Sequence, residues 1–180
     1  MSVHVVTYSS EWKIWFEDLS SKLSYALQDI SCRIEHVGST SVEGLDAKPI
    51  IDIDIILDDF DHFEPAKKAL EGIGYYHRGN LGLEGREMFQ ISNPIHPHNA
   101  YVCAPHALAV KNHLIFRDHL RGHPETAKRY ARLKHELAEK YPNNVDAYCE
   151  AKTEFISSVL AQYNFSLTEI YAIKKANEIE

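Results

Sequence analysis

The chain has 180 residues, of which 44% are hydrophobic, and its formal net charge at pH 7 is -7. This length suits one domain with a substantial core, or a small α/β unit that carries a helical addition. The negative charge argues against non-specific binding to duplex nucleic acid or to an anionic membrane, and it favours a small-molecule ligand.

The cysteines and the N-terminal sequence bear on the compartment. Cys32, Cys103 and Cys149 are odd in number and far apart, which is not the pattern of a disulfide framework, so we expect reduced thiols. The N-terminus lacks a basic segment followed by an apolar one, and no stretch approaches about 18 uninterrupted apolar residues. We therefore expect a cytoplasmic protein that is neither exported nor inserted in a membrane.

The first 104 residues mix helical and strand patterns. Trp12, Leu19 and Leu23 lie at helical spacing and predict a helix over residues 10–29. The segments 32–38 and 50–57 have strand patterns, and a further helix is expected over 61–72. A glycine-rich stretch then predicts a strand, a turn and another strand, followed by a short strand at 99–104.

From Pro105 onward the pattern is helical. Three helices are expected, over residues 107–121, 124–141 and 145–175, with Pro124 in a first helical turn. The predicted fold class is therefore α+β. It comprises a mixed sheet core with an N-terminal helix over residues 1–104 and a C-terminal three-helix region over residues 105–180 packed on that core. Alternatively, both parts form one compact domain.

Two aspartates interrupt the apolar strand "IIDIDIIL". Residues two apart on a strand point to the same face, so Asp52 and Asp54 should project side by side. Mg²⁺ or Mn²⁺ binds one or two carboxylates together with phosphate oxygens, so the pair suits metal-dependent phosphoryl or nucleotidyl transfer. The alternative is that both are charges of an edge strand that faces solvent.

A Gly-Ser pair precedes the aspartates. Gly38 and Ser39 end the preceding predicted strand, and twelve residues separate Ser39 from Asp52. Such a turn can bring backbone N–H groups and a hydroxyl against a phosphate.

The combination of an apolar residue, Gly-Ser, a spacer of this length and Asp-apolar-Asp-apolar resembles the signature of the nucleotidyltransferase superfamily, with its polymerase-β-like fold. Nearly the whole chain resembles the GrpB family within that superfamily. This resemblance rests on "IEHVGSTSVEGLDAKPIIDI", "HLIFRDHLRGHPETAKRYARLKHELAEKY" and "YCEAKTEF". It implies a nucleotidyltransferase-like fold and a nucleotide site.

Carried over by position, the resemblance makes Gly38, Ser39 and Thr40 the phosphate-contacting turn, and it makes Asp52 and Asp54 the catalytic, metal-binding carboxylates. The superfamily adds a third acidic residue on a later strand, for which Glu87 is the best placed here. The GrpB strand before the helical region commonly reads His-x-His-Val, whereas this chain has Asn99 and Tyr101 there.

Basic residues of the helical half are further phosphate-binding candidates. Arg117 and Arg121 lie four apart and share a helical face, so both can converge on a polyphosphate. Lys134 and Lys152 match family positions, and Lys48 precedes the strand that carries the aspartates. The alternatives are a solvated helix face for the arginines and a loop-capping role for Lys48.

Histidines offer a competing site. His96, His98 and His106 crowd one region with Cys103, but no second ligand pair completes a zinc pattern. For His36, which lies within the matched motif, a buried, hydrogen-bonded imidazole is favoured over a role at the mouth of the cleft.

Two functions follow as expectations. The first is Mg²⁺-dependent transfer of a nucleoside monophosphate from a nucleoside triphosphate to an unidentified acceptor. The second is non-catalytic binding of a nucleotide or phosphorylated metabolite at a degenerate site, which an amide in place of the third acid would favour. A structural or partner-binding role of the helical half is a third alternative. Fusions of family members to dephospho-CoA kinase imply a link to coenzyme A biosynthesis.

Overall fold

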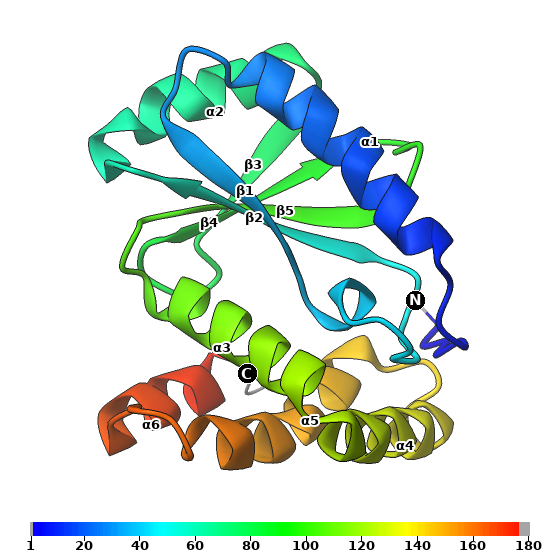
Figure 1. The fold of residues 1–180 in the computed structure, drawn as a ribbon. Coiled ribbons are helices and arrows are strands. Elements are labelled where there is room, and N and C mark those ends of the chain that lie inside the picture. The colour runs from blue at the N-terminus through cyan, green and yellow to red at the C-terminus, as the bar shows by residue number, and fades with distance from the viewer. Residues whose placement is uncertain (1, 177–180) are drawn as a thin grey trace.

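The structure, a computed structural model, describes residues 2–176. A single five-stranded sheet separates two groups of helices (Figure 1). The strands, in chain order, are β1 (Cys32–Val37), β2 (Ile51–Leu57), β3 (Tyr75–Gly79), β4 (Arg86–Ile91) and β5 (His98–Cys103). The helices are α1 (Glu11–Ala26), α2 (Phe63–Gly72), α3 (Leu108–Gly122), α4 (Pro124–Lys140), α5 (Val145–Leu160) and α6 (Leu167–Lys175).

The sheet is mixed, with the strand order β1-β2-β5-β4-β3. Only β2 and β5 pair in parallel, and the β1–β2, β4–β5 and β3–β4 pairs are antiparallel. β2 is therefore an interior strand, with β1 on one edge and β5 on the other. The predicted α+β class is confirmed.

One face of the sheet forms the main core with α1 and α2. Trp12, Leu19 and Leu23 of α1 pack with Ile53 and Ile55 of β2, and all five side chains are at most 5% exposed. The apolar stripe of α1 meets that face because the helix repeat and the strand repeat each place their apolar residues on one side. The helices α3 to α6 lie on the opposite side of the sheet (Figure 1).

The main error of the sequence prediction concerns the last of the three helices expected in the C-terminal half. Instead of one helix over residues 145–175, α5 ends at Leu160 and α6 begins at Leu167. Ser166 starts α6 with a capping box, in which its side chain accepts from the backbone N–H of Glu169 and the Glu169 side chain accepts from Ser166 N–H. Apolar periodicity on both sides of this break concealed the turn.

The remaining predicted elements are present with bounds shifted by a few residues. A 3-10 turn, Phe60–His62, precedes α2, and Pro124 does occupy the first turn of α4. The division at residues 104 and 105 stays a prediction, although Val42 and Leu45 of the first part share a buried cluster with Leu120 and Tyr130 of the second. Within residues 2–176, no helix has both the length and the apolar character needed to cross a bilayer.

Candidate functional site

Asp52 and Asp54 project from β2 toward the helical half of the molecule. In the register of the sheet, Asp52 stands between Val37 of β1 and Asn99 of β5, and Asp54 stands between Glu35 and Tyr101. Directly paired residues point to one face, so all of these side chains share the face opposite the main core. The alternative that the two aspartates are solvent-facing charges of an edge strand is wrong, because β2 is central and Asp54 is 0% exposed.

Asp52 lies against the Gly-Ser turn. Its Oδ1 accepts a hydrogen bond of 2.9 Å from Nδ2 of Asn99. Burial raises the pKa of the Asp52 carboxyl, although the hydrogen bond from Asn99 and the positive charges of His113 and Lys152 oppose that shift. Asp52 is therefore a carboxylate whose charge the fold itself only partly compensates.

The Gly38–Ser39 turn connects β1 to a short 3-10 helix, Ser39–Ser41. Gly38 has φ +70°, a conformation that side-chain-bearing residues rarely adopt. The Ser39 side chain lies near Tyr130 of α4, where it opposes the rise in the pKa of that phenol that burial causes. The Thr40 hydroxyl, by contrast, donates to the carbonyl of Ile50 at 3.3 Å and contacts Nε2 of His36 at 3.1 Å. These two contacts of Thr40 stabilise the turn. Gly38 lies against Asp52, and Ser39 lies next to α4.

Asp54 forms an internal pair with His113 of α3. The Nδ1 atom of His113 lies 2.8 Å from Oδ2 and 3.1 Å from Oδ1 of Asp54. An ionised carboxylate can only accept, so Nδ1 carries the proton. Burial of His113 would lower its pKa, but the charge and hydrogen bond of Asp54 outweigh that effect and raise it. Sequence reasoning missed His113, although its position four residues before Arg117 places it one helical turn away.

Three lysines gather beside this site around two tyrosines. Lys152 Nζ lies 4.4 Å from the centroid of the Tyr148 ring, and Lys48 Nζ lies 5.5 Å from the same centroid. Lys134 Nζ lies 4.8 Å from the Tyr130 centroid and donates to the backbone carbonyl of Asp46. All three predicted lysines are thus brought together, from a loop and from two helices.

The lysines are unusual in their burial. Lys134 is only 2% exposed, and burial, reinforced by the charge of Lys152, lowers its pKa to about 7. Burial and the nearby charge of Lys48 also lower the pKa of Lys152, although the negative charge of Asp52 opposes this. Lys48 and Lys152 are half-buried. Repulsion among neighbouring cations that are partly shielded from water is relieved by an anion, so the cluster is suited to a phosphate group.

The two arginines of α3 contact the chain itself. Arg117 donates from Nη1 to Glu35 at 2.8 Å and to the carbonyl of His36 at 3.1 Å. Arg121 donates from Nε and Nη2 to the carbonyl of Ser41 at 3.2 and 2.8 Å. The shared helical face was predicted correctly, but it meets the segment that carries the Gly-Ser turn. Their contact with a phosphate stays a prediction.

The third acidic position is not filled by Glu87. That residue pairs with Val102, which faces the main core, and its carboxylate contacts His77 at 2.6 Å. Asn99 stands beside Asp52 instead, so the neighbour on β5 is an amide. Within residues 2–176, no group of three or more His, Cys, Asp or Glu side chains is arranged to hold a metal ion. His96, His98, His106 and Cys103 are therefore not gathered into such a group within the described residues.

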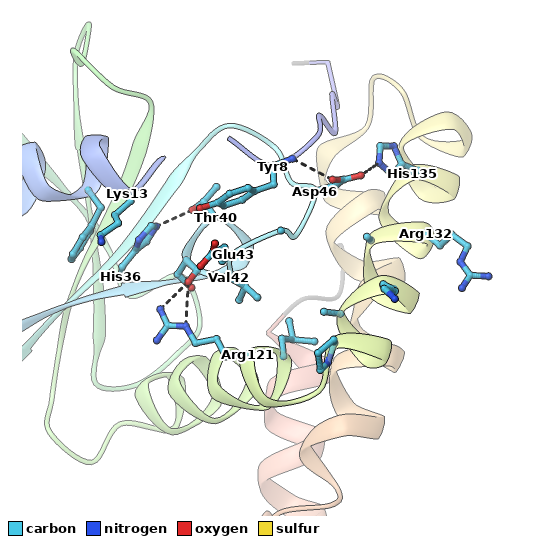
Figure 2. Close-up of a pocket in the computed structure, with 18 of the residues that line it drawn as sticks. Tyr8, Lys13, His36, Thr40, Val42, Glu43, Asp46, Arg121, Arg132 and His135 are labelled. Carbon is cyan, nitrogen blue, oxygen red and sulfur yellow. Dashed lines mark hydrogen bonds and ion pairs between the residues drawn. The ribbon is translucent and has the colours of Figure 1, made fainter. Parts of the chain in front are cut away.

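A groove of about 960 Å³ opens on the outer side of the loop that follows the Gly-Ser turn. Figure 2 shows Thr40, Glu43 and Arg121 among its lining, with His36 bonded to Thr40. His36 pairs with Ile53 in the sheet, so it faces away from the carboxylates, and its ring stacks on Phe16 at 4.6 Å. The imidazole is hydrogen-bonded, as favoured, but it is half-buried rather than buried and it lines the groove. The groove escaped sequence reasoning because its walls come from segments far apart in the chain.

Comparison with solved structures defines the class. Terminal uridylyl transferase 4 from Trypanosoma brucei superposes with a TM-score of 0.55 at 9% identity, covering 94% of this chain and 60% of that one. The crystal structure of the conserved protein GrpB from Enterococcus faecalis superposes with a TM-score of 0.78 at 32% identity, covering 97% of this chain and all of that one. The protein therefore has a nucleotidyltransferase-like fold.

Sequence comparison gives the family. The model of the GrpB protein family matches residues 2–162. Glutamate-rich protein GrpB of Alkalihalophilus pseudofirmus is 33% identical over 163 residues, covering 88% of this chain and 94% of that protein. UPF0157 protein YqkA of Bacillus subtilis is 32% identical over 156 residues, but the match covers 87% of this chain and only 46% of YqkA. The chain belongs to the GrpB family.

Proposed function

We propose that this protein binds a nucleotide or another phosphorylated small molecule between the aspartate-bearing face of the sheet and the helices α4 and α5. The observation that carries the proposal is the convergence of Lys48, Lys134 and Lys152 around the rings of Tyr130 and Tyr148, close to Asp52. Within a chain of net charge -7, buried and half-buried ammonium groups gathered at one place favour a strongly anionic ligand.

The fold supports a nucleotide as that ligand. Terminal uridylyl transferase 4, which shares this fold, has been solved with bound dUTP. The two tyrosine rings add aromatic surface beside the lysines, and a base or ribose can pack against such surface.

Mg²⁺-dependent nucleotidyl transfer is the second candidate. It is favoured by the placement of Asp52 and Asp54 on one face beside the Gly-Ser turn, which agrees with the expected metal pair. It is disfavoured by the amide of Asn99 at the neighbouring position and by the pairing of Asp54 with His113. As arranged, the two carboxylates do not fit a shared magnesium ion.

A thermal-shift screen tests the binding proposal. The melting temperature Tm is measured with ATP, UTP, GTP, CTP and inorganic triphosphate, each with Mg²⁺ and with EDTA. A ligand at 100 times its Kd should add about 2.7 kcal/mol to the free energy of unfolding. A Tm that no phosphorylated ligand raises, at any concentration up to the millimolar range, would show the proposal to be wrong.

Two lysine variants locate the site. Lys152→Met should remove most of the ligand-dependent shift, since the methionine keeps the apolar stem and loses the charge. Lys128→Met is the matched control, because Lys128 lines the outer groove and its side chain is 69% exposed. Equal losses in the two variants would place the ligand elsewhere. Release of pyrophosphate from a nucleoside triphosphate in the same samples tests the transferase candidate.

A further inference from the structure

The contacts of the two carboxylates have a consequence for metal binding. Protein N–H groups contact three of their four oxygens: Asn99 contacts Oδ1 of Asp52, and His113 contacts both oxygens of Asp54. The remaining oxygen, Oδ2 of Asp52, lies against Gly38, where a β-carbon would approach it to 2.4 Å. A cation shared by the two carboxylates would have to compete with these contacts.

His113 is well placed to keep this arrangement. It comes from α3, whose neighbouring residues Val110 and Leu114 pack with Ile56 and Cys103 on the same face of the sheet. The imidazole is thus held by the packing of its helix, and it meets an aspartate that is 0% exposed. Mg²⁺ demands near-octahedral geometry with oxygen ligands at about 2.0 to 2.1 Å, and an imidazole N–H at 2.8 Å occupies that space.

The site also contains further positive charge of its own. The guanidinium of Arg86, on β4, lies 4.9 Å from the centroid of the Tyr101 ring, next to the Asp54 position in the sheet. Among residues 2–176, Nε of Arg86 is buried and has no hydrogen-bond partner. Together with Lys48, Lys134 and Lys152, this group supplies cations around both aspartates.

We propose that His113 takes the place of a divalent cation beside Asp54, so that the carboxylate pair binds no metal and the phosphorylated ligand is held by the protein's own cations. The second half of this inference rests on the proposed function, whereas the exclusion of metal does not. It distinguishes this chain from a transferase in which the aspartates are metal ligands.

The test uses Mn²⁺ alone, followed by electron paramagnetic resonance, on the full chain. Wild type should show no saturable Mn²⁺ binding. His113→Ala should gain a site for about one ion per chain, because it frees two oxygens of a buried carboxylate that has lost its partner. Mn²⁺ should therefore raise the Tm of His113→Ala and leave that of wild type unchanged. Adding Asp52→Asn to His113→Ala should abolish the gain.

Saturable Mn²⁺ binding by wild type that Asp54→Asn abolishes would overturn the proposal. That measurement decides the question even if His113→Ala fails to fold. A folded His113→Ala that gains no site would also overturn it, because the imidazole would then not be what excludes the ion.

The ligand arm repeats the nucleotide thermal shift in EDTA and in Mg²⁺ with wild-type protein. Shifts of equal size in the two conditions support metal-free binding, and a shift that EDTA removes contradicts it. If no nucleotide shifts the Tm in either condition, the proposed function and with it the metal-free binding are wrong. The Mn²⁺ arm still decides whether His113 excludes a cation.

Discussion

A β-carbon on Gly38 would lie 2.4 Å from Oδ2 of Asp52, closer than real contacts allow. The strand that carries the aspartates and the turn that precedes it are thus fitted to each other without intervening space. Glycine is required at this position for two separate reasons, since its φ of +70° also disfavours any side chain.

Gly38→Ala should therefore lower the free energy of unfolding by about 2 to 4 kcal/mol, the sum of a backbone term and a steric clash. Chemical denaturation measures this loss. Gly44→Ala is the matched control, because Gly44 has φ +76° with no atom within 4 Å of its would-be β-carbon. The control should lose only about 1 kcal/mol. Equal losses in the two variants would mean that the contact with Asp52 is not tight.

Asp54→Asn separates a structural carboxylate from a metal ligand. Because both oxygens of Asp54 accept from His113 in a fully buried position, we expect a loss of about 2 to 4 kcal/mol with or without Mg²⁺. Asp52→Asn should change stability by less than about 1 kcal/mol, since burial already disfavours its charge and an amide can still accept from Asn99. Four melting curves for each protein, with and without Mg²⁺ and nucleotide, make the comparison. The metal-pair hypothesis instead predicts that Asp54→Asn has an unchanged or raised Tm without metal and loses its Mg²⁺-dependent shift.

His36 should make stability depend on pH in the acid range. Burial, and then the charges of Arg121 and Arg117, lower its pKa from 6.5 to about 4. Between those values the unfolded chain binds a proton that the folded chain does not, so stability is lost as the pH falls from about 6.5 toward 4. The lowered pKa corresponds to roughly 3 kcal/mol at most. His36→Gln cannot titrate and can still bond to Thr40, so its stability should vary less across this window. A wild-type profile that is equally flat would contradict the assignment.

Arg121→Ala tests what the α3 arginines do. If Arg121 holds the turn through the Ser41 carbonyl, the variant should lose about 1 kcal/mol of stability and also bind nucleotide more weakly. If Arg121 contacts phosphate directly, affinity should fall by about 1.5 to 3 kcal/mol while stability is nearly unchanged. Arg132→Ala is the control, because that side chain lines the same groove and points away from Arg121 (Figure 2). Titration calorimetry and denaturation report the two quantities separately.

Local sequence pattern was enough to predict the strands and most of the helices. Period-two alternation placed Asp52 and Asp54 on one strand face, and helical spacing placed Arg117 and Arg121 on one helix face, because such relations depend only on backbone repeats. The resemblance to the GrpB family added the fold and the Gly38–Ser39 turn. The break between α5 and α6 was missed because apolar periodicity continued on both sides of Ser166.

Only the tertiary structure decided which side chains far apart in the sequence contact each other. His113 reaches Asp54 across 59 positions, and Arg117 reaches Glu35 across 82. No local repeat relates such residues, because their distance depends on how α3 packs across the sheet. That packing buries Asp54 and directs the arginines at the turn, while the register of β2 and β5 places Asn99 beside Asp52. The sequence alone thus determined which residues share a face, and the packing of the helices on the sheet determined which of their charges are already paired.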